Sequence, residues 1–142
     1  MNPAMYLFVN KGLGMSTGKT AAQVAHAAVE AYKASDPALV EAWELGKHYK
    51  KLVMEAEDHE QITNIRNYLV DRGFYPQVVI DEGYTEIRPF SLTALGVPIV
   101  DKDEPHVAAT FGNFKLYREK PKYPTPDDQW KLYRWIQREL RR

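Results

Sequence analysis

A lysine, a glutamine and a histidine follow one another at helical spacing near the start of the chain. Gln23 and His26 lie four and seven residues after Lys19, so all three share one side of a predicted helix. A helix N-terminus offers free backbone N–H groups to an anion, and Lys19 in the first turn adds a positive charge. The pattern favours an anion site. The alternative, a lysine that points into solvent and a histidine packed in the core, stays open.

Asp81 is the carboxylate that could work with Lys19. It ends an apolar strand-like run at 77–81, and the segment that carries Lys19 follows another such run at 5–10. If these strands are parallel neighbours, both residues lie at the carboxyl edge of the sheet, where α/β folds bind ligands. A carboxylate there can orient water or act as a base. A turn-capping aspartate is an equally common interpretation.

Two threonines add hydroxyl groups to the candidate site, whereas neither a P-loop nor a metal site fits the sequence. Thr85 and Thr93 are hydroxyls that can bond to a substrate. A P-loop that ends in Gly18-Lys19-Thr20 needs a glycine at position 13, which is Leu13. The chain has no cysteine, and the remaining histidines show no metal-ligand spacing: His48, His59 and His106. We therefore predict neither a metal nor a cofactor, and we disfavour a nucleotide-hydrolysing protein.

The segments that carry these residues alternate between predicted strands and predicted helices. Helices are expected after the caps at Ser16 or Thr17, Asp36 and Asp58, and again after Asp127. Strands are expected at 5–10, 50–56, 77–81, 85–88 and 114–117. This order predicts a single α/β domain with a mixed four- to five-stranded sheet sandwiched between helices. We expect the domain to span 1–117, followed at 118–142 by a connector rich in Pro and Lys and an extra, basic C-terminal helix.

Composition bounds the kind of protein. The 142 residues contain no apolar run near membrane-spanning length, and the N-terminus lacks the layout of a signal peptide. A cytoplasmic protein without a membrane partner is therefore expected. The net charge is zero, but it is +2 over 1–53, −7 over 54–110 and +5 over 111–142. The basic end could steer a polyanion, although an ordinary solvated helix is an equally good interpretation.

The blocks of sequence at 18–33, 81–93 and 112–117 together resemble the type 2 peptidyl-tRNA hydrolase family. The first, GKTAAQVAHAAVEAYK at 18–33, is similar to the family's helix with its Lys, Ala-Ala-Gln and His-Ala. The second, DEGYTEIRPFSLT at 81–93, is similar to the pattern D-x-G-x-T-x-I-x-P-G-[ST]-x-T. The third, GNFKLY at 112–117, resembles the closing strand G-x-L-K-L-Y. Three blocks in order are more specific than any one of them.

The resemblance implies hydrolysis of the ester that joins a peptide, or an N-blocked amino acid, to the 3′ ribose of tRNA, without a metal. Peptidyl-tRNA is the implied partner, and a homodimer is often formed in this family. The catalytic residues implied are Lys19, Asp81, Thr85 and Thr93, and the substrate-binding residues are Gln23, His26 and Ser91.

The chain departs from the family pattern at three positions close to Asp81. Phe90 stands in place of a glycine, Glu82 in place of an alanine, and Arg88 in place of a small residue or proline. These departures support an alternative function, a non-catalytic descendant that binds tRNA or a protein through the same face. That alternative predicts salt-dependent binding of tRNA without turnover.

Overall fold

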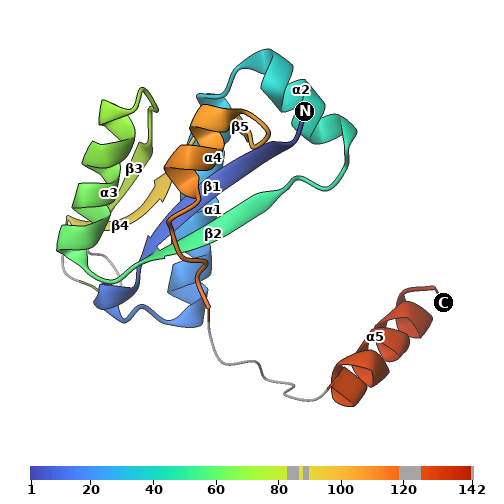
Figure 1. The fold of residues 1–142 in the computed structure, drawn as a ribbon. Coiled ribbons are helices and arrows are strands. Elements are labelled where there is room, and N and C mark those ends of the chain that lie inside the picture. The colour runs from blue at the N-terminus through green and yellow to red at the C-terminus, as the bar shows by residue number, and fades with distance from the viewer. Residues whose placement is uncertain (83–86, 88–89, 119–125, 142) are drawn as a thin grey trace.

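A mixed sheet with helices on both faces makes up the core of the protein (Figure 1). The computed structural model describes residues 1–82, 87, 90–118 and 126–141. The strands are β1 (Pro3–Asn10), β2 (Lys51–Ala56), β3 (Gln77–Asp81), β4 (Ser91–Gly96) and β5 (Val100–Asp101). The helices are α1 (Thr17–Lys33), α2 (Pro37–Leu45), α3 (His59–Asp71), α4 (Pro105–Phe111) and α5 (Pro126–Leu140), with a 3₁₀ turn, η1, at Lys11–Leu13. The predicted fold class is confirmed.

The sheet has the strand order β2-β1-β4-β3, and β5 pairs with the start of β1. Strands β1 and β2 are parallel, whereas β4 runs antiparallel to both β1 and β3. Consequently β1 and β3 run in the same direction with β4 between them. Their carboxyl ends, which carry Asn10 and Asp81, reach the same edge of the sheet.

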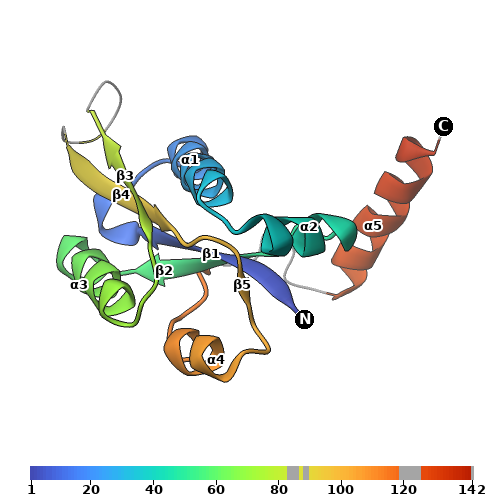
Figure 2. The same cartoon turned by 90° about the horizontal axis from the view of Figure 1, so that it is seen from above.

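Successive side chains of β1 point to opposite faces of the sheet and so contribute to both halves of the hydrophobic core. Met5 and Leu7 belong to the cluster under α1 and α2, and Tyr6 and Phe8 belong to the cluster under α3 and α4. Figure 2 shows α1 and α2 on one side of the sheet and α3 and α4 on the other. Because both faces are covered, β1 is buried along nearly its whole length, as the apolar run at 5–10 predicts.

Three helix caps and one strand lie where the sequence predicts them. Ser16, Asp36 and Asp58 cap α1, α2 and α3, and β3 has the predicted bounds. The strand expected at 85–88 falls mostly outside the described residues, and the next strand is β4, which begins at Ser91. The expected last strand at 114–117 is reduced to one bridge, between Leu116 and Met54, because it follows the edge of β2 only briefly.

The N-terminus is held by Asp101 of β5. Its carboxylate accepts hydrogen bonds from the backbone N–H groups of Asn2 and Asp103, at 2.9 and 3.0 Å. These two bonds favour the ionised form and hold the pKa of Asp101 below its usual range. The first residues of β1 are thereby tied to the β5 turn.

Gly96 allows α1 to pack directly on the sheet. A Cβ at this position would overlap the backbone oxygen of Ala27 and lie 2.9 Å from its carbonyl carbon. We expect Gly96→Ala to lower the free energy of unfolding by about 3 kcal/mol, since α1 would have to move off β4. Urea denaturation measures this loss. Gly18→Ala is the matched control, because nothing lies within 4 Å of its added Cβ. Equal stability of the Gly96→Ala variant and the wild type would contradict this packing.

Candidate active site at the carboxyl edge of the sheet

Lys19 and Asp81 form an ion pair where α1 begins and β3 ends. The Lys19 ammonium donates to Asp81 Oδ1 at 2.5 Å, and each side chain is only 10% exposed. From the sequence, these two residues are expected to meet if the strands before them, β1 and β3, are neighbours. This condition is wrong, because β4 lies between them. The residues still meet, since both strands end at the same edge and α1 crosses β4 to reach β3.

The start of α1 is set by a serine cap. Ser16 Oγ accepts the backbone N–H of Lys19 at 3.2 Å, which fixes the first turn and the direction in which Lys19 leaves it. A positive charge in this turn opposes the helix dipole, which costs roughly 0.3–1 kcal/mol. The Asp81 carboxylate offsets that cost, because it places a negative charge at the helix N-terminus.

The glycines before α1 serve the turn itself. Gly12 packs on the chain that follows β2, where a Cβ would lie 2.7 Å from the Glu57 carbonyl oxygen. Gly14 ends η1 with a φ of 60°, in the left-handed region that glycine favours. The backbone of the turn therefore explains why glycine is present at both positions, without any bound phosphate. This agrees with the mismatch between this segment and a P-loop.

Gln23 and Thr93 form a buried polar pair one turn along α1 from Lys19. The Thr93 hydroxyl lies 2.6 Å from Gln23 Oε1 and 3.2 Å from the carbonyl oxygen of Val79. Thr93 is fully buried and Gln23 nearly so. The pair ties α1 to β3 and β4 directly behind the Lys19–Asp81 pair, so it holds the two charged residues in register.

Breaking the buried pair on one side should cost stability. We expect Thr93→Val to lower the free energy of unfolding by about 1–3 kcal/mol, because Gln23 keeps a buried polar group without its partner. Adding Gln23→Met to the same chain should recover part of that loss, since no amide is then left unpaired. A urea-denaturation cycle on the two single variants and the double variant measures the coupling. Simple additivity would contradict the pairing.

The remaining predicted site residues lie at different distances from this centre. Ser91 opens β4 and pairs in register with Asp81, so it stands beside the carboxylate. His26 lies further along α1, is more than half exposed, and has Nε2 4.0 Å from Glu30 Oε1. Thr85 and Arg88 fall outside the described residues. The structure therefore brings together Lys19, Asp81, Gln23, Thr93 and Ser91 but not His26.

Phe90 and Glu82 border the pair on the solvent side. Phe90 has a φ of 61°, which is rare for a bulky residue, and its ring is 77% exposed. Its backbone N–H donates to the carbonyl oxygen of Asp81 at 2.5 Å. The left-handed backbone explains why the resembling pattern has a glycine here. Glu82 is exposed and follows Asp81 directly.

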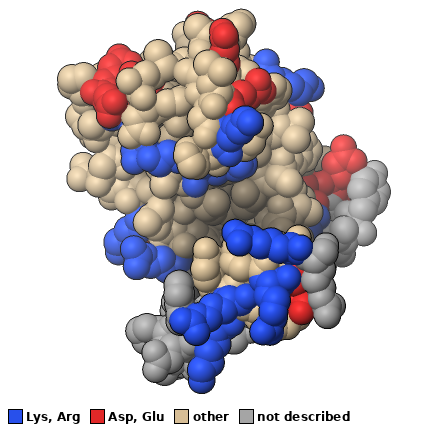
Figure 3. All heavy atoms as spheres, turned by 90° about the vertical axis from the view of Figure 1, so that its right-hand side faces the viewer, with Lys and Arg blue, Asp and Glu red and all other residues tan. Residues whose placement is uncertain are grey.

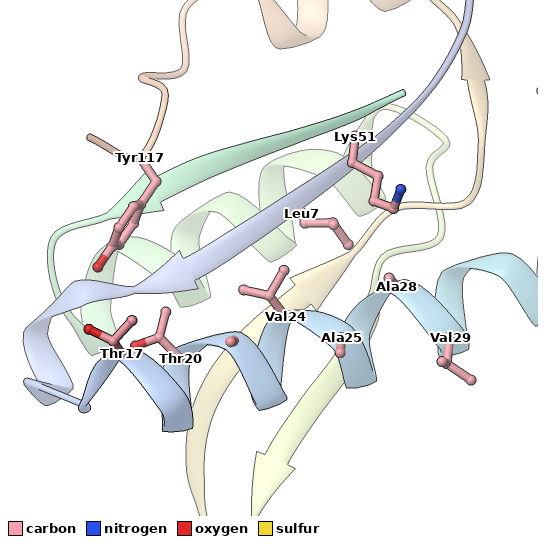
Figure 4. A pocket seen from close by; sticks show the side chains of 10 residues that line it. Leu7, Thr17, Thr20, Val24, Ala25, Ala28, Val29, Lys51 and Tyr117 are labelled. Atoms are coloured by element: carbon pink, nitrogen blue, oxygen red, sulfur yellow. The ribbon is translucent and has the colours of Figure 1, made fainter. Parts of the chain in front are cut away.

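An apolar groove of about 660 Å³ runs along the other side of α1 (Figure 4). It begins at Thr17 and Thr20, under the ring of Tyr117, and continues past Val24 and Ala28 toward Lys51. Tyr117 is held there by its backbone N–H, which donates to the carbonyl oxygen of Val53 at 2.8 Å. The chain therefore leaves the core for α5 beside the end of α1 that carries Lys19.

The described residues limit the kinds of site that are present. Within these residues, no three His, Asp or Glu side chains gather in a way that could hold a metal ion. Over the same part of the chain, no helix combines the length and the apolar character needed to cross a membrane.

The fold and the site define a small α/β protein with a Lys–Asp pair at the carboxyl edge of a mixed sheet. The family model of peptidyl-tRNA hydrolase PTH2 matches residues 4–117, which include every element from β1 to α4 apart from the first residue of β1. The chain therefore belongs to the PTH2 family.

Curated relatives agree with this family. An archaeal peptidyl-tRNA hydrolase from Methanocaldococcus jannaschii is 32% identical over 79% of this chain and 97% of its own. A mitochondrial peptidyl-tRNA hydrolase 2 from Bos taurus is 35% identical over 80% of this chain and 63% of its own. A probable peptidyl-tRNA hydrolase 2 from Schizosaccharomyces pombe is 38% identical over 66% of this chain. The chain spans about half the length of the yeast relative, 46%.

A solved structure shows the same fold. A protein of unknown function from Agrobacterium tumefaciens superposes with a TM-score of 0.51 at 9% identity, over 83% of this chain and 99% of its own. At that identity the likeness concerns the fold alone.

Proposed function

We propose that this protein hydrolyses the ester between a peptide, or an N-blocked amino acid, and the 3′ ribose of tRNA. The observation that carries the proposal is the Lys19–Asp81 pair, nearly buried at the sheet edge of a PTH2 domain. The relatives named above are peptidyl-tRNA hydrolases, including one that aligns over almost its full length.

In the proposed reaction the Asp81 carboxylate accepts a proton from the attacking water. The water oxygen bonds to the ester carbonyl carbon, and Lys19 stabilises the negative charge that develops on the carbonyl oxygen. The bond to the 3′ oxygen then breaks, and that oxygen leaves with the proton. Ser91 and Thr85 orient the water or the ester, Gln23 and Thr93 hold the pair in place, and His26 contacts a more distant part of the substrate.

Further properties belong to the same proposal. The reaction uses no metal and no cofactor, because a carboxylate and an ammonium supply the base and the charge. A homodimer and a cytoplasmic location are proposed as well, whereas the relative from Bos taurus is described as mitochondrial. The alternative is a binding protein without turnover, which the exposed Phe90 and Glu82 beside Asp81 favour.

The deciding experiment incubates the protein with N-acetyl-aminoacyl-tRNA in the presence of EDTA. We expect release of the N-acetyl amino acid together with intact tRNA that can be aminoacylated again, which separates ester cleavage from RNA degradation. Salt-dependent binding of the same tRNA without any release would favour the alternative. Loss of activity in EDTA that a metal restores would contradict the metal-free reaction.

A further inference from the structure

Helix α5 lies beyond the residues that the PTH2 model matches, and it carries a continuous basic face. Lys131, Arg134 and Arg138 follow one another at spacings of three and four residues, so they share one side of the helix. Arg141 follows three residues later, directly after the last residue of α5, and all four residues are exposed. Figure 3 shows Lys and Arg side chains gathered over α5 at the lower end of that view. These four residues form what we call the basic face.

Two features of the basic face fit RNA phosphates. Three of its four residues are arginines, whose planar guanidinium groups can each bind a phosphate through two hydrogen bonds. Trp135 lies four residues after Lys131 and three before Arg138, and it is 52% exposed. An exposed indole between cations offers a surface on which an unpaired base can stack.

The length of chain between the core and α5 keeps the basic face near the active site. The chain leaves the core at Tyr117, beside Thr17 at the start of α1. The eight residue steps from Arg118 to Pro126 span at most about 28 Å, and α5, with its 15 residues, extends about 22 Å further. The basic face therefore stays within reach of any RNA whose end lies at Lys19 and Asp81.

We propose that the basic face of α5 binds the phosphate backbone of tRNA while the 3′ end occupies the site at Lys19 and Asp81. This inference rests on the proposed function for the identity of the RNA. The opposite side of α5, with Tyr133, Ile136 and Leu140, is apolar, so an anionic lipid surface is the competing partner. The tether to a tRNA-directed site and the indole among the arginines favour RNA.

The test measures affinity for deacylated tRNA as a function of salt, with the full chain and without any turnover. In the triple variant Arg134→Gln/Arg138→Gln/Arg141→Gln we expect about tenfold weaker binding, and the slope of log affinity against log salt should fall by roughly one per arginine. Glutamine is a good helix former, so α5 should persist. Gln137→Ala, on the same helix and without a change of charge, is the matched control and should bind as the wild type does.

Several results would overturn the inference. They are an unchanged salt slope in the triple variant, an equal loss in Gln137→Ala, or a triple variant that loses binding to phosphatidylserine vesicles but keeps its affinity for tRNA. The readout is independent of catalysis. A wild type that binds tRNA through α5 but releases no amino acid would contradict the proposed function alone, and an active wild type with an unchanged salt slope in the triple variant would contradict this inference alone.

Discussion

We expect Asp81→Asn to lower kcat for release of the N-blocked amino acid from tRNA by about 10²–10⁴-fold, the usual contribution of a general base. Asparagine keeps the size of the side chain and can still hydrogen-bond to Lys19, but it cannot accept a proton from water. The KM should change little, because the tRNA contacts remain. Steady-state kinetics on purified, folded protein measure both parameters.

Glu82→Gln is the matched control for this result. Glu82 is the next residue, carries the same charge and is exposed, so its substitution should leave kcat within a few-fold of the wild type. Activity that survives intact in Asp81→Asn would remove Asp81 from the reaction. An equal loss in both variants would show that only the local negative charge matters.

Lys19→Ala should lower kcat by about 10²–10³-fold, the range found when one donor to a developing oxyanion is removed. The nearly buried Asp81 also loses its partner, so the protein should be less stable, and the loss is read by urea denaturation alongside the kinetics. Lys33→Ala, which removes an exposed lysine from the last turn of the same helix, should change neither quantity.

The double variant Lys19→Ala/Asp81→Asn tests whether the two residues act in the same step. If the two residues act as a unit, the double variant should be hardly slower than Asp81→Asn alone, because groups that work together give strongly non-additive losses. Full additivity of the two losses would mean that Lys19 and Asp81 act in separate steps.

Much of the scaffold follows from local signals in the sequence. The caps of α1, α2 and α3 and the bounds of β3 depend on short-range chemistry, a capping oxygen or an apolar run, which the sequence displays directly. The sequence does not predict β4, because two of its four buried positions, Ala94 and Gly96, have low strand propensity. Gly96 lets α1 approach the sheet.

The site could be predicted only as a list of residues. The meeting of Lys19 with Asp81 depends on β4 entering between β1 and β3, which is a long-range pairing without a local signal. The partnership of Gln23 with Thr93 likewise depends on how closely α1 packs on β4. The left-handed φ of Phe90 could be found only from the glycine that the family pattern has at that position.

If Asp81, held by Lys19, drives cleavage of the tRNA ester, its substitution must slow the chemical step, which a single-turnover experiment isolates. With enzyme in excess over N-acetyl-aminoacyl-tRNA and EDTA present, the rate of release reports the chemical step apart from binding and product release. We expect rapid release by the wild type and release slowed at least about a hundredfold by Asp81→Asn. Equal single-turnover rates for the two proteins, with tRNA bound equally well, would contradict this role of Asp81.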